Sequence, residues 1–167
     1  MTEALTGRRS VSAAWPGFHE RLTETLRAMT EDQFLILVHK GTNHFVQFAA
    51  QGYYGMRAET VCNAYLEGPE RLTTEDIAML RALGWNDPTS GPELTPHDDP
   101  DGSPNHFLEW APPVDHAEIA ALAVRTFLEV HDVAHPGWLA YTSFDSAGGR
   151  LILPGLGLKP EGNGATQ

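Results

Sequence analysis

Eight histidines and 22 acidic residues are the side chains of this 167-residue chain that could hold a metal or move a proton. His131 and His135 are four residues apart, which is the spacing of two zinc ligands on one face of a helix. Pro136 and Gly137 end the expected helix there, however, and no glutamate follows His131 as the zinc-protease pattern requires. The pair is therefore typical of polar residues at a helix C-terminus.

A second candidate metal site is the run that holds His97, Asp98, Asp99 and Asp101. It resembles part of a calcium-binding loop, but its glycine comes too early, prolines interrupt it, and the glutamate that closes such loops is missing. One alternative stays open. If this loop were ordered over a cleft, His97, Asp98 and Asp99 together with His106 could build a metal-dependent hydrolase.

The nucleophilic side chains lie in contexts that do not favour catalysis. Ser143 and Ser146 fall in an expected strand and turn, without the glycine-flanked elbow of a hydrolase. Cys62 has no histidine beside it and lies on the more apolar face of an expected strand, as buried structural thiols do. The sequence therefore predicts no catalytic residue, no metal and no cofactor, and a chain that is not an enzyme.

The elements that would position these side chains begin with an amphipathic helix over residues 16–30. Residues 33–40 are a short apolar run, which favours a strand that is buried on both faces and central in its sheet. Tight turns then separate two more strands, over residues 44–51 and 56–63. Alternation in the last of these leaves one face largely polar. Three consecutive strands predict an antiparallel meander.

The second half of the chain alternates helices with strands. Thr73 or Thr74 caps a helix that Gly84 ends. Residues 86–104 contain five prolines, which predict a long loop before a strand over 105–110. Asp115 begins a helix that runs to about Asp132, and strands over 138–145 and 150–153 complete the order.

The order α-β-β-β-α-β-α-β-β lacks strict alternation of strand and helix. It predicts an α+β fold, in which an antiparallel sheet has helices packed mainly on one face. The uncovered face then needs a partner or polar side chains. We expect residues 1–14 to be a disordered tail, residues 15–153 to form a single α+β domain, and residues 154–167 to be a flexible tail.

The distribution of charged residues along the chain restricts which kinds of binding partner are expected. Residues 1–66 hold equal numbers of acidic and basic residues, so the whole net charge of −11 lies in residues 67–167. Such a surface repels phosphate backbones and favours cationic partners, which predicts no nucleic acid. The apolar run at residues 34–38 is too short to cross a bilayer, and the lone cysteine excludes an internal disulfide. We expect no membrane partner and a cytoplasmic location.

Several short sequence motifs between residues 16 and 145, taken in their order along the chain, resemble those of the TY-Chap N-terminal domain family of bacterial proteins. They are FLIL at 34–37, FVQF at 45–48, RAE at 57–59, NAYL at 63–66, LRALGW at 80–85, NHF at 105–107, EW at 109–110 and LAVRT at 122–126. The resemblance implies a fold similar to the type III secretion chaperones and to YbjN, with the order α-β-β-β-α-β-β-α. This chain departs from that order, because a lone strand and then a helix follow residue 105.

The resemblance implies binding of a peptide or protein client by a chaperone-like sheet, with secreted effectors or toxin and immunity proteins as candidate clients. Either an edge or a face of the sheet could receive the client. Candidate contacts from the meander are Phe45, Gln47, Tyr53, Tyr54, Arg57 and Glu59. The alternative for each is ordinary packing in the core or on the solvent face. A structural homodimer module is a further alternative, since related chaperones tend to dimerise.

Overall fold

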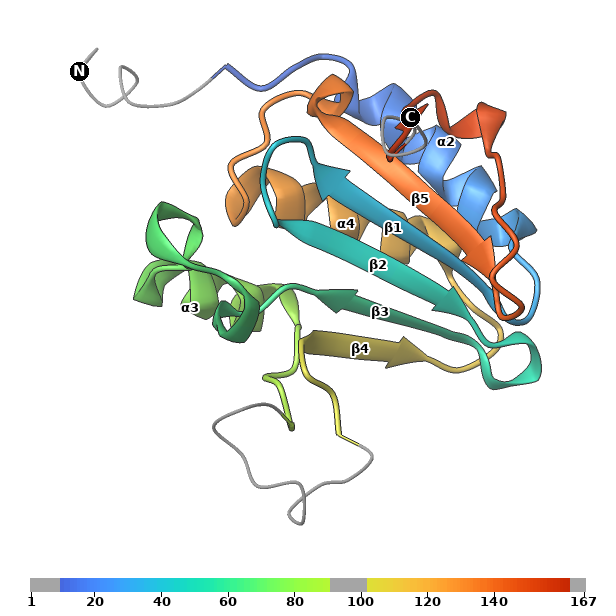
Figure 1. Cartoon of the computed structure of the whole chain (residues 1–167), viewed down its shortest axis with the longest axis horizontal. Coiled ribbons are helices and arrows are strands. Elements are labelled where there is room, and N and C mark those ends of the chain that lie inside the picture. Colours follow the sequence, from blue (N-terminus) through green and yellow to red (C-terminus); the bar gives the residue numbers. More distant parts are fainter. Residues whose placement is uncertain (1–9, 91–101, 163–167) are drawn as a thin grey trace.

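The computed structural model describes residues 10–90 and 102–162. Within them one sheet has the strand order β4-β3-β2-β1-β5-β6, and helices α2 and α4 lie behind it in the view of Figure 1. The strands are β1 (Gln33–His39), β2 (Phe45–Ala50), β3 (Met56–Thr60), β4 (His106–Trp110), β5 (Leu139–Asp145) and β6 (Lys159–Pro160). The helices are α2 (Trp15–Ala28), α3 (Thr74–Leu83) and α4 (His116–Glu129). This arrangement confirms the predicted α+β fold, the antiparallel meander and the central position of β1.

One face of the sheet is covered by α2 and α4, and the core lies between these two layers. Helix α2 contributes Phe18, Leu22 and Leu26, and α4 contributes Ile119 and Phe127, all of them fully buried. Each such side chain stabilises the packing by about 1.5–3 kcal/mol. The two helices also pack against each other, so they form one continuous layer.

The helices after the meander begin where the sequence predicts. The Thr73 hydroxyl accepts a hydrogen bond from the Asp76 N–H, and the Asp76 carboxylate accepts one from the Thr73 N–H. Asp115 caps α4 by accepting from the Glu118 N–H. Helix α4 ends before the predicted boundary at Asp132, because that residue has a φ of 61° and cannot continue a right-handed helix.

The prediction that β1 is buried on both faces is wrong for one of them. Leu35 and Leu37 point toward the helix layer and are fully buried. Phe34 and Ile36 lie on the opposite face and are only partly buried. Since α2 and α4 lie on the same side of the sheet, no helix in the described part of the chain covers the second apolar face of β1.

The C-terminal segment (residues 149–161) also differs from the prediction. Residues 150–153 form no strand. Arg150 makes only an isolated bridge with Phe144, and the last strand is β6, which runs parallel to β5. Leu156 was expected in a flexible tail, yet it is fully buried and its carbonyl accepts a hydrogen bond from Arg21 Nε at 3.2 Å. Leu156, with partly buried Leu153 and Leu158, anchors this glycine-rich stretch to the core, which periodicity does not reveal.

The predicted loop over residues 86–104 has a hydrogen-bonded base. Asn86 exchanges two backbone hydrogen bonds with Phe107, and the N–H groups of Thr89 and Ser90 both donate to the Ser103 carbonyl. Residues 91–101 of this loop lie outside the described residues, as do residues 1–9 and 163–167 of the two predicted tails. The loop therefore leaves the sheet from a defined base.

The Thr126 hydroxyl supports a testable prediction about the core. Trp85 Nε1 donates to Thr126 Oγ1 at 2.9 Å, Thr126 donates to the Leu122 carbonyl at 2.7 Å, and both Trp85 and Thr126 are buried. Thr126→Val keeps the shape but leaves the indole N–H without an acceptor, so we expect the free energy of unfolding in urea to fall by about 1–3 kcal/mol. Thr25→Val is the control, because Thr25 is only partly buried and its hydroxyl donates to the Arg21 carbonyl without serving a buried indole. This variant should lose less than about 0.5 kcal/mol. Equal losses in both variants would contradict the prediction.

Candidate functional site

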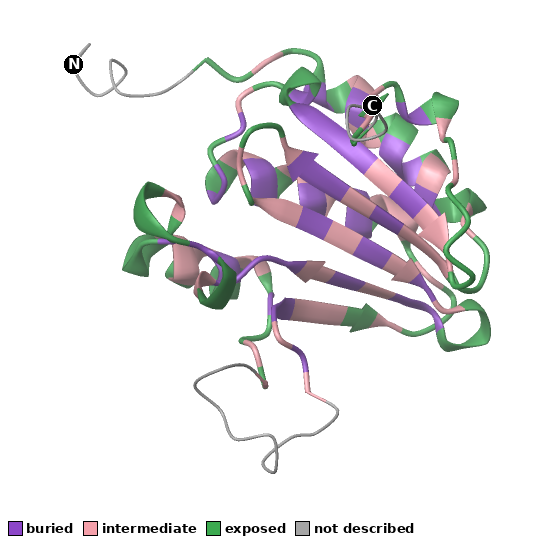
Figure 2. Ribbon diagram, viewed as in Figure 1, coloured by how far each residue is buried: buried purple, intermediate pink, exposed green. Residues whose placement is uncertain are grey.

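No helix of residues 10–90 and 102–162 lies in front of the face of the sheet opposite α2 and α4 (Figure 2). We call it the open face. Its residues are Phe34, Ile36 and Val38 of β1, Phe45, Gln47 and Ala49 of β2, Arg57 and Glu59 of β3, Phe107 and Glu109 of β4, and Thr142 and Phe144 of β5. The pairing register sets them in rows across five strands. One row consists of Thr142, Ile36, Gln47, Glu59 and Phe107.

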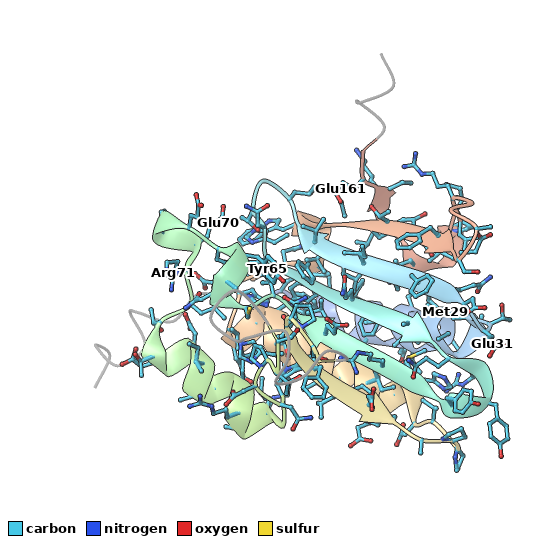
Figure 3. The ribbon with its side chains drawn as sticks, turned by 60° about the horizontal axis from the view of Figure 1, so that its bottom comes forward. Met29, Glu31, Tyr65, Glu70, Arg71 and Glu161 are labelled. Atoms are coloured by element: carbon cyan, nitrogen blue, oxygen red, sulfur yellow. The ribbon has the colours of Figure 1, made fainter. Side chains whose placement is uncertain are left out.

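Two of the hollows on the open face adjoin each other. The smaller, of about 220 Å³, is lined by residues that include Phe34, Ile36, Gln47, Arg57, Glu59 and Phe144. The larger, of about 400 Å³, is lined by residues that include Ile36, Val38, Phe45, Gln47, Tyr65 and Glu161. Ile36 and Gln47 line both, so we treat the two as one open-face hollow. Tyr65 and Glu161 reach it from outside the five large strands, and Figure 3 shows both near the end of the sheet opposite Met29 and Glu31.

Arg57 organises the charged side of the open face. Its Nε donates to Glu59 Oε2 at 3.2 Å, and its Nη1 donates to Glu109 Oε1 at 2.6 Å. The guanidinium carbon lies 4.8 Å from the centre of the Phe107 ring. Only 20% of the Arg57 side chain is exposed, so these contacts hold it in one position. The open face thus has an apolar half over β5 and β1, and a half over β3 and β4 where two carboxylates share one guanidinium.

The structure brings together four of the six contacts predicted from the sequence. These four lie on the open face and are Phe45, Gln47, Arg57 and Glu59. Gln47 and Glu59 are direct neighbours in the register of β2 and β3. Tyr53 and Tyr54 lie instead in the turn between these strands, where they are 87% and 75% exposed and their rings meet edge to face. The two tyrosines therefore belong to an end of the sheet and not to the hollow.

Sequence reasoning missed the apolar half of the open face. Phe34 and Ile36 belong to the run that was expected to be buried on both sides, and Phe144 lies in a strand for which no contact was predicted. A signal was present, because the run has two apolar faces while the expected helices cover mainly one side of the sheet. Tyr65 and Glu161 come from irregular segments, for which periodicity carries no signal.

Both edges of the sheet are partly closed by the chain itself. On β5, the carbonyl oxygens of Tyr141 and Ser143 accept hydrogen bonds from N–H groups of the C-terminal segment, at 2.7 and 2.8 Å. On β4, the N–H and carbonyl of Phe107 both bond to Asn86. The open face is therefore more accessible to a partner than either edge.

The histidines with shifted pKa values include two that lie in the core. The ring of His131 is fully buried, hydrogen-bonds to Thr60 Oγ1 at 2.8 Å, and stacks on His44 with 4.8 Å between ring centres. Burial, and secondarily the neighbouring His44, hold the pKa of His131 well below its ordinary value. Burial also lowers the pKa of His106, and Asp87, whose Oδ1 lies 4.0 Å from His106 Nδ1, partly offsets this.

Among residues 10–90 and 102–162, no three His, Cys, Asp or Glu side chains are placed to hold a metal ion. His97, Asp98 and Asp99, which the hydrolase alternative needs, lie outside these residues. His135 is exposed, and its Nδ1 accepts a hydrogen bond from the Gly137 N–H at 2.7 Å. In the same ranges no helix is long and apolar enough to cross a membrane.

Within the described residues, a mostly antiparallel sheet carries α2 and α4 on one face, which defines an α+β fold. The family model of TY-Chap3, described as T3SS (YopN, CesT) and YbjN peptide-binding chaperone 3, matches residues 8–145. The chain therefore belongs to this family, which confirms the resemblance to TY-Chap proteins. Among the described residues α4 follows β4 directly, so the departure from the order implied by the resemblance is also present in the structure. No curated protein and no solved structure matches the chain significantly.

Proposed function

We propose that this chain is a non-enzymatic, chaperone-like protein that binds segments of other polypeptides on its open face. The observation that carries the proposal is the open-face hollow, where aromatic and aliphatic side chains are only partly buried. A partner that removes such a surface from water gains free energy in proportion to the apolar area covered. Membership of a family described as peptide-binding chaperones supports the same function.

The proposed contacts divide into two groups. Phe45 and Gln47 form part of the floor of the hollow, and Arg57 and Glu59 form its charged side. Tyr53 and Tyr54 add an exposed aromatic pair at the turn between β2 and β3, which extends the contact for longer clients. Among these six contacts Phe45 should contribute most, because it is the aromatic side chain of the six that lines the hollow.

The proposed clients are cationic segments of other proteins in the cytoplasm, since the chain has a net charge of −11. Secreted effectors or toxin and immunity proteins are the proposed source of such segments. A homodimer, in which a second copy covers the open face, is the competing proposal. Measurement of the mass in solution separates the two, because a monomer leaves the hollow accessible.

Nuclear magnetic resonance with an unfolded basic protein tests the proposal. Reduced, carboxamidomethylated lysozyme stays unfolded and positively charged, and native lysozyme is the folded control. On adding the unfolded form to isotope-labelled protein, we expect the largest amide shift changes at Ile36, Phe45 and Gln47. Changes confined to α2 and α4, or equal changes with native lysozyme, would show that the open face is not the binding surface.

Substitutions measure how much each of the two groups of contacts contributes to the affinity for the client. Phe45→Lys places a charge in the hollow and opposes a cationic client, so we expect affinity for the unfolded lysozyme to fall at least about tenfold. The double variant Tyr53→Ser, Tyr54→Ser should have a smaller effect, because both rings lie outside the hollow. Circular dichroism checks that the variants remain folded. A larger loss in the tyrosine variant than in Phe45→Lys would move the site to the turn.

A further inference from the structure

The open face offers side chains to a partner, but few backbone groups. Strands β1, β2 and β3 each pair with a neighbour on both sides, so their N–H and carbonyl groups are engaged within the sheet. An extended peptide lying on this face would bring its own N–H and carbonyl groups against Phe34, Ile36 and Phe45, which cannot bond them. Each buried polar group left without a partner costs about 1–3 kcal/mol. The face therefore disfavours an extended client.

Addition of a client strand at an edge meets a different obstacle. The outer edge of β5 already bonds to the C-terminal segment, through the carbonyl groups of Tyr141 and Ser143. The outer edge of β4 already bonds to Asn86 at Phe107. Little of either edge is left for a continuous run of main-chain hydrogen bonds.

A helix avoids both obstacles, because it bonds its own backbone groups internally and presents only side chains. Helices are also what the sheet accepts on its other face, where α2 and α4 cover the equivalent positions of the same strands. Five strands at about 4.8 Å spacing span about 19 Å, which a helix of about 13 residues would cross at 1.5 Å per residue.

The charges beside the hollow indicate what should flank the apolar stripe of such a helix. Glu59, Glu109 and Glu161 lie on or beside the hollow, while Arg57 already bonds to the first two. Arg150, whose Nη2 donates to the Glu161 backbone carbonyl at 2.7 Å, adds a second guanidinium beside Glu161. Three carboxylates against two guanidinium groups still leave an acidic excess at this surface. Lys or Arg on the client would complement it.

We propose that the client segment bound on the open face is an amphipathic helix, with an apolar stripe in the hollow and Lys or Arg beside that stripe. This inference rests on the proposed function and specifies the class of client. It excludes an extended segment on the face and a strand added at an edge. Ile36 is the central contact, because it lines both parts of the hollow.

Selection from a phage-displayed library of random 18-residue peptides tests the inference. Peptides are enriched on the full chain and depleted on Ile36→Lys, and the most enriched one is synthesised. We expect apolar residues at i, i+3, i+4 and i+7, with Lys or Arg between them. The synthetic peptide should gain helical circular dichroism on binding, and a proline placed at its centre should weaken binding at least about tenfold. Replacing its Lys and Arg residues with Gln should also weaken it.

The matched control is Ile152→Lys, which makes the same substitution at an exposed isoleucine that does not line the hollow. Affinity should fall at least about tenfold in Ile36→Lys and stay unchanged in Ile152→Lys. Peptides that depend on Ile36 but alternate apolar and polar residues would overturn the helical client and leave the proposed function standing. If no peptide distinguishes the wild type from Ile36→Lys, both the inference and the proposed binding face are wrong.

Discussion

Replacing Gly55 with alanine is expected to lower the free energy of unfolding by about 3 kcal/mol or more. Gly55 has a φ of 101°, which side chains rarely adopt, and an added Cβ would lie 1.8 Å from the carbonyl oxygen of Trp110. That oxygen belongs to the backbone of β4 beside the start of β3, where Met56 pairs with Trp110. It cannot move away without disturbing the pairing of the two strands.

Gly41→Ala provides the matched comparison for this effect. Gly41 also has a positive φ, of 80°, but nothing lies within 4 Å of an added Cβ. Only the backbone strain remains, so we expect a loss of about 1–2 kcal/mol. Urea denaturation of both variants measures the difference. Similar losses at the two glycines would contradict the close approach of Gly55 to β4.

Acidification below about pH 6.5 is expected to destabilise the fold before most carboxylates titrate. Burial lowers the pKa of His131 in the folded chain, and the titratable groups that act on it, His44, His39 and His106, all oppose its protonation. The unfolded chain therefore binds a proton that the folded chain does not. Stability from this group is fully present above the unfolded pKa and falls by up to about 1.4 kcal/mol per pH unit below it.

His131→Gln isolates this contribution. Glutamine does not titrate and keeps an N–H that can donate to Thr60, so the variant should lose most of the slope between pH 6.5 and 5.5. The measurement is the free energy of unfolding in urea at several pH values. The change of this free energy with pH is compared between wild type and variant, because the substitution also changes packing and shifts the absolute values. His106 and His116 also have lowered pKa values, so some slope should persist. Identical slopes in the wild type and the variant would exclude His131 as the source.

The parts of the fold that follow from local patterns could be predicted from the sequence. The alternation along β3 places Met56 and Ala58 in the core, with Arg57 and Glu59 on the other face, as the structure does. Thr73, one of the two predicted cap residues, caps the helix, because its hydroxyl needs only an N–H three residues away. Such interactions lie within a few residues of each other, so no knowledge of the tertiary structure is required.

The apolar half of the open face and the C-terminal packing could not be predicted in this way. Whether Ile36 is covered depends on where distant helices lie, and the apolar pattern of β1 looks the same in either case. The burial of Leu156 depends on its packing in a core built by residues far away in the chain, and its carbonyl bonds to Arg21, 135 residues away. The charged contacts among Arg57, Glu59 and Glu109 likewise require the register of β3 with β4, which neither strand specifies alone.

The hydrogen bonds that the C-terminal segment makes along β5 have a consequence for solubility. An unprotected edge strand is a template on which further copies can stack into fibrils. Here that template is already occupied by the protein's own backbone, anchored through Leu156. Concentrated solutions of the intact domain should therefore resist fibrillisation, whereas a truncation that removes this covering would create a chain that nucleates its own aggregates.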